Sequence, residues 1–153
     1  LEIKTTRDIA HQIVRHRSFS FQEFSQRYAD PETQGDLFEY SEARLQDTKN
    51  RQHSIEIDDQ KLQDEWKNRQ EEVALAAKYA YDWAIDQGIA KEQARKVLPE
   101  GLTKTTLYMN GTLRSWVHYI ELRSANGTQK EHMDIAKECA LVIAKIFPMA
   151  KDL

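Results

Sequence analysis

Residues 15–28 read RHRSFSFQEFSQRY and gather cationic, aromatic and hydroxyl side chains in one short stretch. Three side chains that can carry a positive charge, Arg15, His16 and Arg17, are consecutive and repel one another. A fold accepts that repulsion more readily where an anion neutralises the charges, and the arginine fork suits phosphate through two parallel hydrogen bonds. The stretch therefore predicts an anion site, although a solvated basic face at the end of a helix would have the same composition.

Upstream of this stretch, the sequence predicts a strand and a short helix. Residues 1–4 are typical of the end of a strand, and residues 5–8 (TTRD) predict a capping box with Thr5 as the N-cap. The helix is expected to end near Val14. Its spacing would place three polar side chains on one face, namely Gln12, Arg15 and His16.

Downstream, the sequence predicts an extended segment and then a long loop. Aromatic and polar residues alternate over residues 18–28, and a change in the parity of the aromatic positions indicates a bulge or break near Gln22. Residues 30–58 are polar and predict a loop with short pieces of structure. Loops of this length are often functional when they are ordered.

The rest of the chain predicts mainly helix. Asp58 or Asp59 is expected to cap a long helix that ends near Gln87, with an apolar stripe of Leu62, Trp66, Val73, Ala77, Ala80 and Ala84. The later elements are a helix over 91–97, a strand over 103–109, an amphipathic helix from Leu113 and, opened by a capping box at 128–131, an apolar helix to Phe147. Together they predict one α+β domain over residues 1–153, with a small, mostly antiparallel sheet, several helices packed on it, a long central helix and an apolar C-terminal helix.

Composition limits the possible partners. The chain has 22 basic and 25 acidic residues and a formal net charge of −3, which argues against general binding to nucleic acid or to a membrane surface. The longest apolar stretch, near residues 139–146, is too short to cross a bilayer, and no signal peptide is expected at the N-terminus. A single cysteine predicts a reducing, cytoplasmic setting. A local cluster of cations in an acidic protein favours a small anionic ligand.

The order of residues in the opening stretch resembles the signature of the flavin-dependent thymidylate synthase family. Arg15-His16-Arg17 is followed, after seven intervening residues, by Ser25, which Glu23 and Arg27 flank. Further similarity lies in the segments 95–99 (RKVLP) and 114–123, and in Gln129. The resemblance covers nearly the whole chain, more weakly over residues 30–90. In this family a substantial segment precedes the first helix, so the chain is expected to be a fragment or a divergent short form.

The resemblance implies an enzyme of dTMP biosynthesis that methylates dUMP. Methylenetetrahydrofolate would supply the carbon, FAD reduced by NADPH would supply the hydride, and a homotetramer would share its active sites between subunits. Arg123 would be catalytic, because it would face the uracil ring and stabilise its ionised form. The implied dUMP-binding residues are Gln12, Arg15, Glu23, Ser25, Arg27, Arg95 and Arg123. The implied FAD-binding residues are Arg15, His16, Arg17, Glu23, Arg114 and His118.

Other interpretations of the same residues remain open. A catalytically inactive nucleotide-binding or regulatory homologue would keep the anion site but lack a complete flavin site. Cys139 lies in an apolar helix and is expected to pack in the core rather than act as a nucleophile. No metal site is expected, because the histidines have no partners at ligand spacing. Trp66, Trp83 and Trp116 are expected to be core residues rather than flavin contacts.

Overall fold

A three-stranded antiparallel sheet lies at the centre of the computed structural model, which describes residues 1–125 and 127–148. The strand order is β1 (Glu2–Thr6), β5 (Lys104–Asn110), β2 (Ser20–Glu23). β5 contributes β-branched and apolar residues, which suit a buried middle strand. The small antiparallel sheet expected from the sequence is therefore confirmed.

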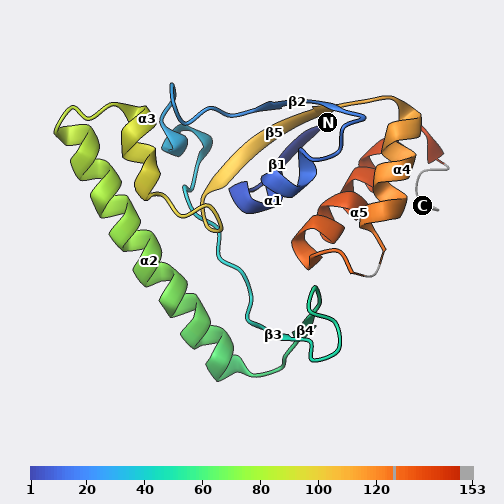
Figure 1. The fold of residues 1–153 in the computed structure, drawn as a ribbon, viewed down its shortest axis with the longest axis horizontal. Helices are drawn as coiled ribbons and strands as arrows, with labels where there is room; N and C mark the ends of the chain where they lie inside the picture. The colour runs from blue at the N-terminus through green and yellow to red at the C-terminus, as the bar shows by residue number, and fades with distance from the viewer. Residues whose placement is uncertain (126, 149–153) are drawn as a thin grey trace.

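Helices α4 (Leu113–Arg123) and α5 (Lys130–Ala144) pack against each other beside the sheet (Figure 1). Together with the short helix α1 (Arg7–Ile13) they form the main hydrophobic core. Its buried members are Ile3, Ile9, Ile13, Phe19, Leu107, Met109, Trp116, Tyr119, Ile120, Ala136, Cys139, Ala140 and Ile143. The arrangement of helices on a small sheet confirms the α+β class, and the apolar C-terminal helix is part of its core.

The longest helix, α2 (Gln60–Asp86), begins as expected, because the side chain of Asp59 accepts a hydrogen bond from the backbone N–H of Leu62 at 3.0 Å. Gly88, with φ +74°, follows its end. α2 runs along one side of the molecule rather than through its centre (Figure 1), which corrects the expected central position. With the short helix α3 (Lys91–Ala94) and the 3₁₀ helix 95–97, it encloses a second, smaller core of Leu37, Tyr81, Ala84, Ala94 and Leu98.

The buried face of α2 differs in part from the predicted stripe. Ala77 and Ala84 are buried as expected, but Trp66 and Trp83 are 42% and 54% exposed. Of the three tryptophans, only Trp116 is a core residue. Leu62 and Val73 are also exposed, whereas the polar residue Gln70 is buried together with Ala74 and Tyr81.

Two glutamine side chains of α2 explain this difference. Gln70 exchanges two hydrogen bonds, each 2.9 Å, with the backbone N–H and carbonyl of Ser41. Gln63 forms the same pair with the backbone of Ala43, at 2.7 and 2.9 Å. The side-chain amides therefore satisfy the main chain of the loop much as a neighbouring strand would.

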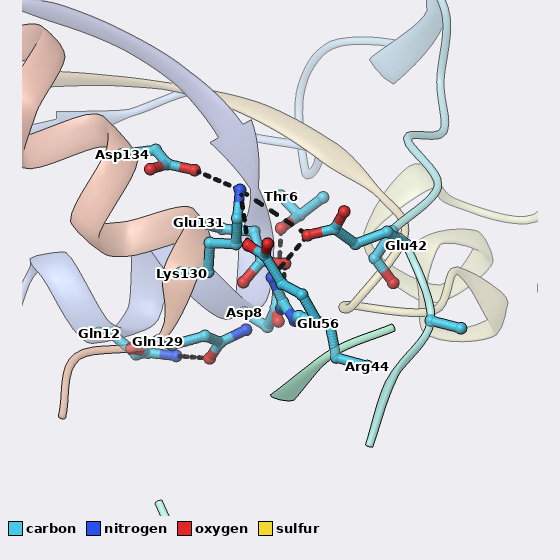
Figure 2. Close-up of polar contacts among 12 residues, drawn as sticks. Thr6, Asp8, Gln12, Glu42, Arg44, Glu56, Gln129, Lys130, Glu131 and Asp134 are labelled. Atoms are coloured by element: carbon cyan, nitrogen blue, oxygen red, sulfur yellow. Dashed lines mark hydrogen bonds and ion pairs between the residues drawn. The ribbon is translucent and has the colours of Figure 1, made fainter. Parts of the chain in front are cut away.

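Residues 30–58 form the expected loop with short pieces of structure. These are a 3₁₀ helix at Pro31–Gln34 and a small hairpin of β3 (Arg44–Gln46) and β4 (Ser54–Glu56). The hairpin lies beside the start of α5, where Figure 2 shows its ion pairs.

Several predicted boundaries need correction. The N-cap of α1 is Thr6 instead of Thr5, and α5 begins after Gln129, so Thr128 is not its cap. Because α1 ends at Ile13, Arg15 and His16 lie beyond the helix and do not share its polar face with Gln12. β2 ends at Glu23, which agrees with the expected break. Among the described residues, no helix is long and apolar enough to cross a membrane.

Candidate functional site

Arg123 and His16 contact each other although 107 residues separate them. Arg123 is the last residue of α4, and its Nε donates a hydrogen bond of 2.9 Å to Nε2 of His16, in the turn after α1. Burial, and then the positive charges of Arg123 and His118, lower the pKa of His16. His16 is therefore neutral at pH 7, and since its Nε2 accepts, its proton lies on Nδ1.

Gln12, in α1, bonds Gln129, the N-cap residue of α5. Its Nε2 donates to Oε1 of Gln129 at 2.8 Å, as Figure 2 shows. Gln129 borders a cavity of about 360 Å³ that none of the predicted arginines lines. The cations of this cavity are already neutralised: Arg44 pairs with Glu131 and Glu42, and Lys130 pairs with Asp134 at 3.2 Å. An anionic ligand gains little from charges balanced in this way.

Glu23 binds Arg7, a contact that the sequence did not predict. Its Oε1 accepts hydrogen bonds from Arg7 Nη1 at 3.1 Å and from Thr105 Oγ1 at 2.9 Å. Arg7 also lies 3.9 Å from Glu100. The sheet explains this contact, because it sets β2 and the start of β5 beside the beginning of α1. Nothing in the local sequence indicates a partnership across 16 residues.

Arg27 and Arg95 lie near the same short helical segment. Arg27 Nη2 is 3.5 Å from Glu92 Oε2 in α3, and its guanidinium lies 5.4 Å from the centre of the Tyr28 ring. Arg95 follows Glu92 by three residues, in the 3₁₀ helix that continues α3. Ser25 lies in the turn that leads to Arg27, and its carbonyl accepts from the backbone N–H of Tyr28.

The predicted residues thus form two groups. We call Gln12, Arg15, His16, Arg123 and Gln129 the helix-end group, and Ser25, Arg27, Glu92 and Arg95 the α3 group. Figure 1 shows α3 at one side of the molecule and the end of α4 at the other, with the sheet between them. Four predicted residues are in neither group: Arg17, Glu23, and Arg114 and His118, which are exposed on α4. His118 is nevertheless close enough to His16 for its charge to lower the pKa of that ring. One chain therefore does not gather all the predicted residues around a single ligand.

Among the described residues, most of the predicted arginines lack a carboxylate partner, whereas three of the four other arginines have one and Arg51 does not. Arg7, Arg44 and Arg69 form ion pairs with carboxylates. Within residues 1–125 and 127–148, five arginines predicted to bind ligands have no carboxylate partner: Arg15, Arg17, Arg95, Arg114 and Arg123. Arg27 has one partner, at 3.5 Å and half-exposed. Unpaired cations at the predicted positions are what an anion site requires.

Cys139 is a core residue. It is 4% exposed, and burial raises the pKa of its thiol to about 12. The thiolate needed for nucleophilic attack is therefore negligible at neutral pH. The described part of the chain also holds no cluster of three or more metal-binding side chains.

Fold and side chains together define an α+β protein with cationic surfaces suited to an anionic ligand. Residues 1–149 match the family model described as thymidylate synthase complementing protein. The chain therefore belongs to this family, which confirms the resemblance found in the sequence.

Two relatives align with nearly the whole chain. A probable flavin-dependent thymidylate synthase of Paramecium bursaria Chlorella virus 1 is 50% identical over 149 residues, and a flavin-dependent thymidylate synthase of Synechocystis is 47% identical over 148 residues. Both alignments cover 97% of this chain, but 67% and 66% of the respective relatives. The chain thus spans about two thirds of the length of the relatives it matches.

Proposed function

We propose that this chain methylates dUMP to dTMP, with methylenetetrahydrofolate as the carbon donor and FAD, reduced by NADPH, as the hydride donor. The observation that carries the proposal is the set of unpaired arginines, because they occupy the positions predicted to bind ligands. The names of the two relatives agree with the proposed reaction.

The phosphate of dUMP is assigned to Arg27 and Arg95. A phosphate dianion matches the forked donors of arginine. The single ion pair of Arg27, to Glu92, is long and half-exposed, and such surface pairs contribute little. The phosphate can therefore replace Glu92 at small cost. Ser25 adds a hydroxyl donor beside this pair.

Arg123 is assigned to the uracil ring. Its Nε is taken by His16, so its two terminal nitrogens remain available to the ligand. An arginine keeps its charge at every physiological pH, and a fixed cation stabilises the negative charge that develops on the ring. The ionised ring is a better carbon nucleophile. Gln12 and Arg15 would complete this end of the dUMP site.

The residues assigned to FAD fit a ligand with a diphosphate. Arg15, Arg17 and Arg114 are exposed and unpaired within the described chain, and the neutral His16 offers an N–H donor at Nδ1. His118 would be a further contact. Glu23 keeps one oxygen, Oε2, for a ligand hydroxyl. Bound FAD would supply hydride transfer, while the protein positions the reactants.

We propose further that the sites are shared within a cytoplasmic homo-oligomer, most simply a tetramer. In Figure 1, α3 lies at one side of the molecule and α4, which ends at Arg123, lies at the other. One nucleotide can contact both groups only if they come from different copies. The balanced charge of the chain does not favour nucleic acid as a partner.

A second candidate function is nucleotide binding without turnover. It is favoured by Glu23, predicted for both ligands, because its Oε1 is already engaged by Arg7 and Thr105. A protein that stays colourless after addition of FAD, yet is stabilised against heat by dUMP, would support this candidate.

Release of tritium from [5-³H]dUMP tests the proposed reaction directly. The full-length protein, loaded with FAD, should release tritium only when NADPH and methylenetetrahydrofolate are both present. An assembled, flavin-loaded protein that releases none would contradict the proposed function.

A further inference from the structure

A buried polar pair lies directly behind His16. Tyr119 of α4 and His132 of α5 are both 0% exposed, and the Tyr119 hydroxyl lies 3.1 Å from Nε2 of His132. The other ring nitrogen of His132, Nδ1, is buried without a hydrogen-bond partner among the described residues. Leaving such an atom unpaired costs stability, so stability alone does not explain a histidine at this position.

The pair forms the surface on which the His16 ring rests. The rings of His16 and Tyr119 meet edge to face, with centroids 4.9 Å apart and planes at 84°. His16 and His132 are 6.3 Å apart in the same kind of arrangement. On its other side His16 accepts the hydrogen bond from Arg123. A continuous series of contacts therefore links His132 of α5, Tyr119 of α4 and His16. It ends at the guanidinium of Arg123, which we propose acts on uracil.

Arg123 is the one charged member of this group at neutral pH. Burial, Arg123 and His16 lower the pKa of His132 to about 4, and burial raises the pKa of Tyr119. His16 is neutral as well. A neutral His16 accepts from Arg123 only as the Nδ1–H tautomer, in an orientation that aims Nε2 at Arg123.

We propose that Tyr119 and His132 are positioning residues that hold the His16 ring in the orientation that aims Nε2 at Arg123, and thereby fix the guanidinium of Arg123. The inference rests on the proposed function for its effect on catalysis. The guanidinium is planar, so a fixed Nε directs both terminal nitrogens. A displacement of about 1 Å in such a group can cost up to a hundredfold in rate.

Three variants test the proposal. Tyr119→Phe removes the hydroxyl but keeps the ring, and His132→Leu removes the polar partner. Each should lower kcat about tenfold while the KM for dUMP changes less than about twofold, because binding groups remain and only the placement of Arg123 loosens. His132→Gln restores an amide near the position of Nε2 and should recover most of kcat.

Tyr81→Phe is the matched control. Tyr81 is 2% exposed in the second core, so the variant makes the same chemical change at a buried tyrosine far from His16. It should leave kcat at the wild-type value. If Tyr119→Phe and His132→Leu also kept the wild-type kcat, or if His132→Gln lost as much as His132→Leu, the positioning role would be refuted.

The ¹⁵N resonances of His16 report the positioning without turnover. In the wild type, Nε2 should appear unprotonated and Nδ1 protonated. In His132→Leu the two signals should move toward the averaged values of a free imidazole, and in Tyr81→Phe they should not move. Unchanged signals in His132→Leu would overturn the proposal. A wild type inactive in the tritium assay, with these signal changes intact, would contradict the proposed function and leave the positioning supported.

Discussion

At the scale of single residues, Arg123 shows how one contact prepares a side chain for a ligand. A free arginine samples many rotamers, and ordering it on binding would weaken the complex. The hydrogen bond to His16 orders the guanidinium beforehand, and it uses a neutral partner, so the positive charge is not cancelled. A carboxylate in the place of His16 would hold Arg123 equally well but would compete with the anionic ligand.

Replacing Arg123 separates turnover from flavin binding. Arg123→Ala should lower kcat at least about a hundredfold, because the fixed cation at the uracil ring is lost, whereas FAD content should stay close to wild type. The absorbance of bound flavin and the tritium-release rate measure the two effects. Arg69→Ala, at an exposed ion pair on α2, is the control and should change neither. Loss of flavin from Arg123→Ala would show that the residue belongs to the cofactor site.

Because of His132, we expect the free energy of unfolding to decline in acid. Its pKa is about 4 in the folded protein and 6.5 when unperturbed. Between these values the unfolded chain binds a proton that the folded chain does not, so the free energy of unfolding falls as the pH falls. The full window corresponds to about 3 kcal/mol. Urea unfolding at pH 7.5 and pH 4.5 should show a smaller decline for His132→Leu than for wild type. Equal declines would contradict this prediction.

At the scale of elements, the junction between β5 and α4 depends on a close approach of backbone and ring. A Cβ on Gly111 would lie 2.5 Å from Cδ1 and 2.7 Å from Cε1 of Phe19. Phe19 is itself wedged against the rings of Trp116 and Tyr119, so its ring has little room to give. The absence of a side chain at Gly111 therefore allows α4 to begin beside the edge of the sheet that β2 forms.

Gly111→Ala should destabilise the protein by about 1–3 kcal/mol, the usual result of overpacking a core. Gly101→Ala is the matched control, because nothing lies within 4 Å of its Cβ and its φ is not positive. That variant should be neutral or slightly stabilising. Thermal unfolding of both variants measures the difference, and equal melting temperatures would disprove the close approach.

Elements whose pattern is local were predictable from the sequence, and contacts between distant segments were not. The β-branched run of β5 and the Asp59 cap of α2 carry their own signals. The prediction of the apolar stripe of α2 was wrong in part, because Gln70 is buried by its hydrogen bonds to the loop backbone. Hydrophobic periodicity does not indicate such bonds. For the site, the arginine positions followed from the resemblance. The contact between Glu23 and Arg7 could not be predicted from the sequence, because it depends on the pairing of β2 with β5.

At the scale of the whole molecule, the separation of the helix-end group from the α3 group predicts complementation between subunits. Arg27→Ala and Arg123→Ala should each be nearly inactive alone. In a mixed oligomer some sites would combine the intact Arg27 of one subunit with the intact Arg123 of another. Co-expression with two affinity tags, followed by the tritium assay on the doubly tagged oligomer, should therefore recover part of the activity.

The control for complementation uses two residues in direct contact. His16 and Arg123 lie 2.9 Å apart in one chain, so a mixture of His16→Ala and Arg123→Ala never restores an intact pair and should be no more active than His16→Ala alone. If the Arg27 and Arg123 mixture were equally inactive, the two groups would not serve one shared site.

The two glutamines of α2 have a consequence for how this protein can diverge. Gln63 binds the peptide N–H and carbonyl of Ala43, which every residue except proline offers. Gln70 binds the peptide groups of Ser41 and also accepts a hydrogen bond from the Ser41 hydroxyl at 3.2 Å. The side chain at position 43 is therefore free to mutate without detaching the loop from the long helix. Natural variation should therefore accumulate at position 43 sooner than at Gln63, whose side-chain amide binds the main chain there.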